Sequence, residues 1–153
     1  MIQTALPILT LRKAVPTDYF TLWQLRNDVT VRRALNHRAI SFFDFIKEVE
    51  SSSQIYLAGV VGESVAGYAQ LSVFSAKVVG VFVAIFQSER QRGFGTQLCN
   101  SAYLWATANG YERVIASVDK NNPAGLALAN KCGFKFEGSA PGKGELKNLY
   151  ARS

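Results

Sequence analysis

The stretch Arg90-Gln91-Arg92-Gly93-Phe94-Gly95-Thr96 joins an apolar run, Val78–Ile85, to a helix-forming run, Gln97–Ala108. A strand that ends in a glycine-bearing turn and opens a helix leaves several backbone N–H groups unpaired, with the positive end of the helix dipole behind them. Such donors suit an anion, and a pyrophosphate in particular. The stretch therefore predicts a binding site for a phosphate-bearing cofactor.

Four residues of this turn favour close contact with an anion. Gly93 and Gly95 allow the backbone to approach the ligand, because a Cβ atom there would stand in the way. Arg90 and Arg92 add positive charge beside the amides. A glycine turn that only caps a helix is the alternative interpretation.

Length and composition indicate one globular domain over residues 1–153, with 48% apolar residues. No apolar run reaches the roughly 18 residues that span a bilayer. Residues 1–7 lack the segments of a signal peptide, so we expect a cytoplasmic protein without a membrane partner. Cys99 and Cys132 are expected to be reduced, packed thiols.

The net charge is +6 and the sequence pI is about 9.5. These charges are dispersed, and the densest groups are Arg32-Arg33 and Arg90–Arg92. A small polyanionic ligand explains such pairs as well as nucleic acid does, so we expect no nucleic-acid partner.

The apolar pattern predicts an α/β (α+β) domain with a mixed, mostly antiparallel sheet of about six to seven strands and about four helices. The run Ala76–Ile85 is almost wholly apolar, which places it at the centre of the sheet. Strands are expected at Ile8–Ala14, Gln54–Val61, Ser64–Phe74, Ala76–Ile85, Arg113–Val118, Phe134–Gly138 and Glu145–Arg152. Helices are expected at Pro16–Arg26, Ser41–Glu50, Gly93–Asn109 and Asn122–Lys131, with a short turn or helix at Val31–Leu35.

Two other phosphate-binding motifs fit the sequence less well. A dinucleotide-binding turn would need a third glycine where Leu98 stands, and its glycines would follow the strand directly instead of lying well beyond Ile85. The segment Gly138–Lys143 resembles a P-loop, but the spacing between its glycine and its Gly-Lys pair is one residue short. Gly144 also stands where the motif requires Ser or Thr.

With these elements placed, the chain resembles the GNAT superfamily of N-acetyltransferases, which transfer the acetyl group of acetyl-CoA to an amine. Its Arg/Gln-x-x-Gly-x-Gly/Ala signature is matched by Arg90, Gly93 and Gly95. A second signature, an Asn followed by a helix that closes on Gly-Phe, is matched by Asn122, Leu128, Lys131, Gly133 and Phe134. The resemblance covers nearly the whole chain and implies a GNAT-like fold and acetyl-CoA as cofactor.

The N-terminal half is most similar to the branch that acts on amino-sugar nucleotides. The segments that carry this similarity are Leu25-Arg26-Asn27-Asp28, Val31-Arg32 and Ile40-Ser41. Similar segments occur in relatives that acetylate protein N-termini. The branch implies a small-molecule amine as acceptor, and a homodimer is expected by analogy.

The resemblance implies how the cofactor is held. The strand Val81–Ile85 separates from Val114–Val118, pantetheine lies in the gap, and the pyrophosphate rests on the amides of Gln91–Thr96. Asn122 either contacts the pantetheine arm or its waters, or is a plain helix cap before Pro123, and the two roles are compatible. The implied cofactor-binding residues are Val83, Ile85, Arg90, Gln91, Arg92, Gly93, Phe94, Gly95, Thr96, Asn122 and Lys131.

The catalytic residues are left undetermined. Many members of the superfamily carry a Tyr, as general acid, at the position of Ala129 in this chain. The strand Ala76–Ile85 also has no carboxylate that could serve as general base. Another group or solvent must move the protons, and orientation of the two reactants can still supply about 7–11 kcal/mol.

Several residues are candidates for the acceptor site. Tyr68, Gln70 and Ser72 alternate on one strand face, which either lines the acceptor site or is an ordinary solvated face. His37, the only histidine, is either a base or a surface residue, and no metal site can be built from several histidines. Arginines could pair with acceptor phosphates. The substrate-binding candidates are Arg26, Asn27, His37, Tyr68 and Gln70, with Arg32 and Arg33 as further cations.

The sequence thus predicts an acetyl-CoA-dependent N-acetyltransferase that acts by direct attack in a ternary complex. A small-molecule amine, such as an amino-sugar nucleotide, is the favoured acceptor. Acetylation of a protein N-terminus or lysine is the second hypothesis. A coenzyme-A-binding sensor or interaction domain without catalysis is the third, and the absence of a Tyr at Ala129 supports it.

Overall fold

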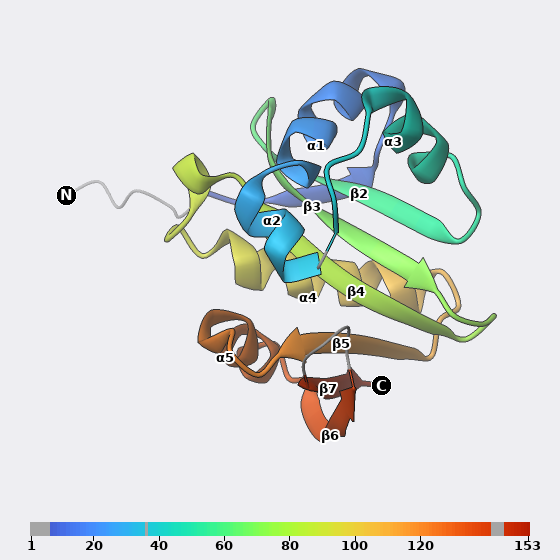
Figure 1. Cartoon of the computed structure of the whole chain (residues 1–153), viewed down its shortest axis with the longest axis vertical. Coiled ribbons are helices and arrows are strands. Elements are labelled where there is room, and N and C mark those ends of the chain that lie inside the picture. The colour runs from blue at the N-terminus through green and yellow to red at the C-terminus, as the bar shows by residue number, and fades with distance from the viewer. Residues whose placement is uncertain (1–6, 36, 142–145) are drawn as a thin grey trace.

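A computed structural model describes residues 7–35, 37–141 and 146–153. Its centre is one seven-stranded sheet in the order β1-β2-β3-β4-β5-β7-β6 (Figure 1). Every neighbouring pair is antiparallel except β4 and β5, which are parallel. The strands are β1 (Thr10–Lys13), β2 (Gln54–Val61), β3 (Ser64–Val73), β4 (Val78–Ile85), β5 (Arg113–Asp119), β6 (Lys135–Pro141) and β7 (Leu146–Arg152). The mixed sheet and the central place of β4 are as predicted.

Helices cover both faces of the sheet. One face carries α1 (Tyr19–Arg26), α2 (Val29–Leu35) and α3 (Phe42–Val49). The other carries α4 (Phe94–Ala108) and α5 (Pro123–Lys131). Two short 3-10 helices occupy Pro16–Asp18 and Gln87–Glu89.

The described residues thus contain five α-helices where about four were expected, because the Val31–Leu35 turn is part of a full helix. Asp28 explains its start: its Oδ1 accepts from the amide of Thr30 at 2.9 Å and from that of Val31 at 3.4 Å. Ser41 caps α3 as predicted, with its Oγ accepting from the Asp44 amide at 3.1 Å.

Other boundaries differ from the prediction by a few residues. The first strand is shorter than Ile8–Ala14, and β6 begins one residue later and runs further than Phe134–Gly138. The predicted strand start at Glu145 and the P-loop-like residues Lys143 and Gly144 lie outside the described residues.

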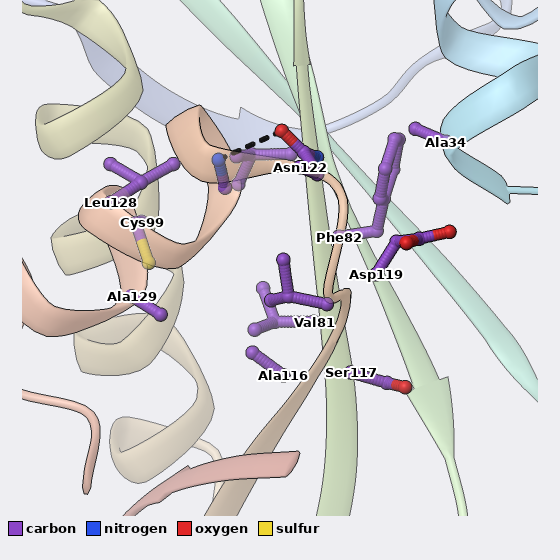
Figure 2. A pocket seen from close by; sticks show the side chains of 13 residues that line it. Ala34, Val81, Phe82, Cys99, Ala116, Ser117, Asp119, Asn122, Leu128 and Ala129 are labelled. Carbon is purple, nitrogen blue, oxygen red and sulfur yellow. Dashed lines mark hydrogen bonds between the residues drawn. The ribbon is translucent and has the colours of Figure 1, made fainter. Parts of the chain in front are cut away.

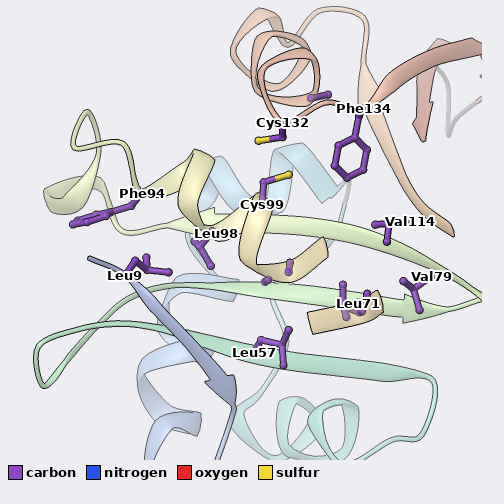
Figure 3. Close-up of a cluster of buried hydrophobic side chains, with 14 of the residues drawn as sticks. Leu9, Leu57, Leu71, Val79, Phe94, Leu98, Cys99, Val114, Cys132 and Phe134 are labelled. Atoms are coloured by element: carbon purple, nitrogen blue, oxygen red, sulfur yellow. The ribbon is translucent and has the colours of Figure 1, made fainter. Parts of the chain in front are cut away.

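The larger core lies between the sheet and the two helices α4 and α5 (Figure 3). Leu57, Leu71, Val79 and Val114 from four strands meet Leu98 of α4 there, and all five are fully buried. Cys99 and Cys132 are free thiols in the same core, and burial raises the pKa of both. They are packed thiols, as expected.

No helix in the described ranges is long and apolar enough to cross a bilayer. In the same part of the chain, no three His, Cys, Asp or Glu side chains are grouped closely enough to hold a metal ion.

Candidate cofactor and acceptor site

The parallel strands β4 and β5 stay together for only part of their length. They pair from Val78 with Arg113 to Gly80 with Ile115, and beyond that point they separate. A cavity lies in the gap (Figure 2). Its lining comes from β4, β5, α4, α5 and the end of α2: Ala34, Val81, Phe82, Val83, Cys99, Ala116, Ser117, Val118, Asp119, Asn122, Gly125, Leu128 and Ala129.

The backbone of β4 directs hydrogen-bonding groups into this gap. In an antiparallel pair, alternate residues bond across the ladder. The Phe86 amide donates to the Ala66 carbonyl at 3.0 Å, and the same alternation turns Phe82 and Ala84 toward β3. Val83 and Ile85 therefore turn their N–H and C=O groups the other way, toward β5. This geometry fits the contacts expected of them with a pantetheine chain.

The glycine turn follows β4 and begins α4. Gly93 is the N-cap residue of α4 with φ of 78°, a left-handed conformation that favours glycine, and Gln91 has φ of 64°. The Arg90 amide bonds to the Gln87 carbonyl and the Gln97 amide to the Gly93 carbonyl. Between them, the six amides of Gln91–Thr96 have no acceptor among the described residues. The turn therefore offers the unpaired donors that an anion-binding turn requires.

The side chains of the turn differ in burial and in the hydrogen bonds that they already make within the protein. Phe94 is only 1% exposed and packs in the core, so its amide alone faces the turn. Arg92 donates to Glu89 Oε2 at 2.6 Å, and Arg90 Nε lies 3.4 Å from the Ile85 carbonyl oxygen. A Cβ atom on Gly95 would meet Ile85 Cδ1 at 3.6 Å, an ordinary contact. The fold itself therefore leaves room for a side chain at Gly95.

Two further predicted cofactor residues belong to α5. Asn122 lines the cavity, and its Oδ1 accepts from the Gly125 amide at 3.0 Å, so it is a helix cap at the edge of the gap. Lys131 lies in the last turn of α5 and is exposed. Ala129, at the place of the usual Tyr, is buried and lines the cavity.

A second cavity adjoins the first where β4 and β5 begin to separate. It adds Leu35, Ser72, Phe74, Gly80, Ile115 and Lys147. The two cavities share Ala34, Val81, Phe82 and Ser117. The two cavities therefore have part of their lining in common.

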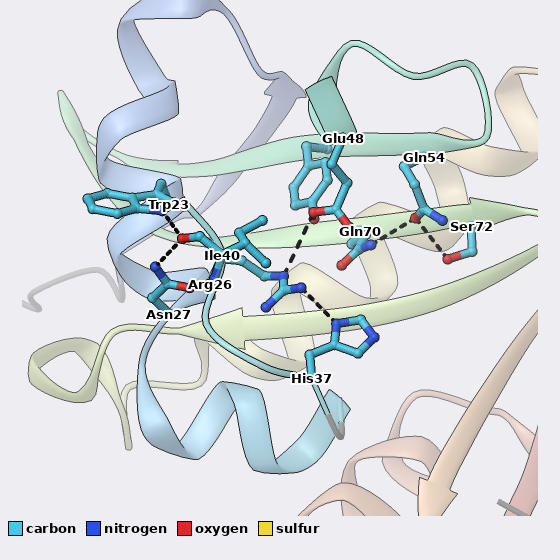
Figure 4. A network of polar contacts seen from close by, with 10 residues as sticks. Trp23, Arg26, Asn27, His37, Ile40, Glu48, Gln54, Gln70 and Ser72 are labelled. Atoms are coloured by element: carbon cyan, nitrogen blue, oxygen red, sulfur yellow. Dashed lines mark hydrogen bonds and ion pairs between the residues drawn. The ribbon is translucent and has the colours of Figure 1, made fainter. Parts of the chain in front are cut away.

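Three of the predicted substrate residues, Arg26 of α1 and Tyr68 and Gln70 of β3, line neither cavity. Figure 4 shows Arg26 and Gln70 within a network of polar contacts. Arg26, Tyr68 and Gln70 are 3%, 0% and 5% exposed, so the interpretation as a solvated strand face is wrong for Tyr68 and Gln70. The helices α1 and α3 cover this face of β3. Burial raises the pKa of Tyr68, which keeps the phenol protonated at neutral pH.

The buried Arg26 is held by two partners. Its Nη2 donates to His37 Nδ1 at 2.8 Å, and its Nε lies 3.8 Å from Glu48 Oε2. Because a guanidinium only donates, His37 Nδ1 accepts, so the neutral ring carries its proton on Nε2. Tyr56 donates its hydroxyl to the same Glu48 oxygen at 2.7 Å.

Asn27 anchors the segment after α2. Its Nδ2 donates to the Ile40 carbonyl at 2.9 Å, and its Oδ1 accepts from the Ile40 amide at 3.0 Å. Trp23 Nε1 donates to the same carbonyl at 2.8 Å. Asn27 thus joins the end of α1 to the residue before the N-cap of α3.

The sequence interpretation missed Ser117, Asp119 and Lys147 as lining residues. Ser117 and Asp119 are two residues apart on β5, so they share a face of the strand. For Ser117 and Asp119 the only available sign was their place at the end of an apolar run a few residues before Asn122. Lys147 reaches the cavity because β7 pairs with β5, with Lys147 opposite Asp119.

The family model described as acetyltransferase (GNAT) family matches residues 18–134. The structure is similar to a spermidine N-acetyltransferase from Vibrio cholerae in complex with CoA and spermine, with a TM-score of 0.82, 18% identity and 94% of each chain covered. It is also similar to an aminoglycoside acetyltransferase in complex with coenzyme A, with a TM-score of 0.81, 16% identity, and 95% of this chain and 94% of that chain covered.

A GNAT-family acetyltransferase from Streptococcus pneumoniae gives a TM-score of 0.73 at 22% identity, with 94% of this chain and 98% of that chain covered. At these identities the likeness concerns the fold. No curated protein matches the sequence significantly.

Proposed function

The chain belongs to the acetyltransferase (GNAT) family, and from that premise we propose that its acceptor is a small primary amine with an anionic group, such as an amino-sugar nucleotide. The protein is an acetyl-CoA-dependent N-acetyltransferase. The observation that supports the proposal is the succession of three features: the unpaired amides of Gln91–Thr96 after β4, the gap between β4 and β5, and the second cavity that shares lining residues with the first.

The available hydrogen-bond donors support a place for the cofactor. The amides of Gln91–Thr96 suit the pyrophosphate oxygens, with the N-terminal end of α4 behind them. Val83 and Ile85 turn backbone groups toward the gap, where they suit the amides of pantetheine. Acetyl-CoA supplies the activated acyl group, and the protein supplies its orientation toward the acceptor.

The burial of both cysteine thiols favours direct transfer of the acetyl group from acetyl-CoA to the amine. Burial raises the pKa of Cys99, which lines the first cavity, and of Cys132. Protonated thiols are poor nucleophiles, which disfavours an acetyl-cysteine intermediate. The amine nitrogen then attacks the thioester carbon itself, and holding both reactants in one site accounts for much of the acceleration, about 7–11 kcal/mol.

The second cavity favours an anionic acceptor over a polycation. Its walls are mostly apolar, Lys147 is its charged residue, and no Asp or Glu is among the described residues that line it. Exposed Arg33 lies on α2, one residue before Ala34 in the wall. A polyamine would need carboxylates to offset its charge, whereas a phosphate or carboxylate is attracted to Lys147.

A thiol-release assay with acetyl-CoA and a panel of amines tests the acceptor. We expect turnover with an amino-sugar nucleotide or glucosamine 6-phosphate, and kcat/KM at least tenfold lower for spermidine and kanamycin. Turnover restricted to a peptide amine would instead support the protein acetyltransferase hypothesis. CoA binding without turnover on any amine would support the sensor hypothesis, which the absence of a Tyr at Ala129 also favours.

A further inference from the structure

We propose that Ser117 carries the proton from the attacking amine to the departing sulfur. The inference rests on the proposed function and adds a catalytic residue to it. The reaction needs such a group, because the usual general acid is replaced by Ala129, whose side chain has no proton to give. The strand β4 carries no carboxylate in its sequence VVGVFVAI, so it offers no base either.

Ser117 lies where the two cavities meet. Ala34, Val81, Phe82 and Ser117 line both of them, and the hydroxyl of Ser117 is the only polar side-chain group of these four. Figure 2 shows the serine on β5 beside the gap, with its hydroxyl on the same side of the strands as Phe82 and Asp119. The thioester sulfur would lie in the first cavity and the amine in the second, so one hydroxyl is within reach of both sides.

The strand fixes this position. Ser117 is two residues beyond Ile115, the last residue of β5 that pairs with β4. On its other side it pairs with Leu149 of β7, which holds the backbone in register. The side chain is exposed, and its hydroxyl makes no hydrogen bond to any residue that the structure describes. It is therefore able to turn toward either cavity.

A hydroxyl suits this step because it accepts and donates at the same time. Attack by the amine forms the C–N bond and leaves a positively charged nitrogen in the tetrahedral intermediate. As the C–S bond breaks, Ser117 Oγ takes a proton from that nitrogen and gives its own proton to the sulfur. The products are the neutral amide and the free CoA thiol, and the serine is regenerated in the same step.

Other nearby groups fit the role less well. Asp119 lies on the same face of β5 but lines only the first cavity, and its Oδ1 accepts from the Asn121 amide at 2.8 Å. Cys99 lines only the first cavity and belongs to the buried core. Lys147 lines only the second. Of the described side chains that line both cavities, only that of Ser117 carries a transferable proton.

The test compares Ser117→Ala with Ser139→Ala, which removes an exposed serine of β6 that lines neither cavity. Thiol release is measured with glucosamine 6-phosphate and, as a small probe amine, with hydroxylamine, after subtraction of the uncatalysed rate. We expect Ser117→Ala to lower kcat about 100-fold, the lower end of acid–base effects. The KM for acetyl-CoA should change less than twofold, and Ser139→Ala should match the wild type.

Two further readouts separate proton transfer from a structural role. The solvent deuterium isotope effect on kcat should change in Ser117→Ala, and Ser117→Thr, which keeps the hydroxyl, should recover at least a tenth of wild-type kcat. A kcat within threefold of wild type in Ser117→Ala, or a change in KM alone, would overturn the inference while leaving the proposed function intact. A wild-type protein that neither binds CoA nor releases thiol would overturn both.

Discussion

At the scale of single residues, Asp18 shows how one carboxylate joins the first strand to the first helix. Arg12 donates to it through Nη1 at 2.5 Å and Nη2 at 2.9 Å, and the Val15 amide donates at 2.9 Å. Asp18 is only 5% exposed. The hydrogen bonds from Arg12 are the main reason why the pKa of Asp18 lies below its ordinary value of 3.8.

Asp18→Asn should therefore destabilise the fold in a pH-dependent way. A lowered folded-state pKa means that the carboxylate stabilises the protein above about pH 3.8, and that this contribution disappears as the pH falls through the folded value. We expect a loss of about 1–2 kcal/mol at pH 7, since Arg12 is half exposed, and a smaller loss near pH 3. Urea unfolding at both pH values measures it, with exposed Glu63→Gln as control. An equal loss at both pH values would contradict the assignment.

Gly95→Asp should abolish cofactor binding without unfolding the protein. A Cβ at this position meets only ordinary contacts, but the carboxylate would stand among the amides that face the pyrophosphate. We expect the Kd for CoA to rise more than 30-fold in calorimetry. Thr107→Asp adds the same charge near the other end of α4 and should bind CoA like the wild type. Unchanged binding by Gly95→Asp would refute the placement of the pyrophosphate.

At the scale of elements, β3 and β4 approach each other too closely at Gly67 for any side chain. A Cβ there would lie 2.2 Å from the Ala84 carbonyl oxygen, a backbone atom that cannot turn aside. Gly67 pairs with Ile85, the last residue of β4 before the glycine turn. The register of this pair therefore helps to set where the turn begins.

Gly67→Ala should cost about 2–4 kcal/mol of unfolding free energy, because the two strands must move apart. The shift of β4 should also weaken CoA binding. Thermal and urea unfolding together with calorimetry measure both effects. Gly95→Ala is the matched control for stability alone, since its added methyl meets Ile85 Cδ1 at 3.6 Å, and its stability should stay within about 1 kcal/mol of wild type. A fully stable Gly67→Ala would show that the strands are not packed this closely.

At the scale of the whole molecule, the sheet is joined across its middle by few contacts. Three residue pairs connect β4 to β5, and the gap beyond them separates β1–β4 from β5, β7 and β6 (Figure 1). A cofactor in the gap would contact both parts. Because a ligand that binds only the folded state stabilises it by mass action, the cofactor should stabilise the entire protein.

Saturating CoA should therefore raise the melting temperature. At a concentration about 100 times Kd, the gain is about 2.7 kcal/mol, or about 5–10 °C for a chain of this size. Differential scanning calorimetry measures it, and Gly95→Asp should show no increase. Pantetheine, which lacks the pyrophosphate, should give a smaller shift than CoA. The absence of any shift with CoA would count against a cofactor in the gap.

The acceptor side was the least predictable part of the site. Tyr68 and Gln70 alternate along β3 in a way that suits an exposed face, yet α1 and α3 cover them. Alternation gives the side of the strand on which a residue lies, but not what packs against that side. Ser117 was missed for the same reason. It lines both cavities only because β4, β5 and the end of α2, which are distant in sequence, meet there.

The amino-acid sequence by itself determined the features that depend on near neighbours. The glycine turn before α4, the caps at Ser41 and Asn122, and the apolar run of β4 follow from local backbone chemistry and from the pattern of apolar residues. Only the tertiary structure decided which side chains are buried, that β7 lies between β5 and β6, and that two cavities meet at Ser117. Burial and cavities arise from contacts between distant segments, and no local pattern records those contacts.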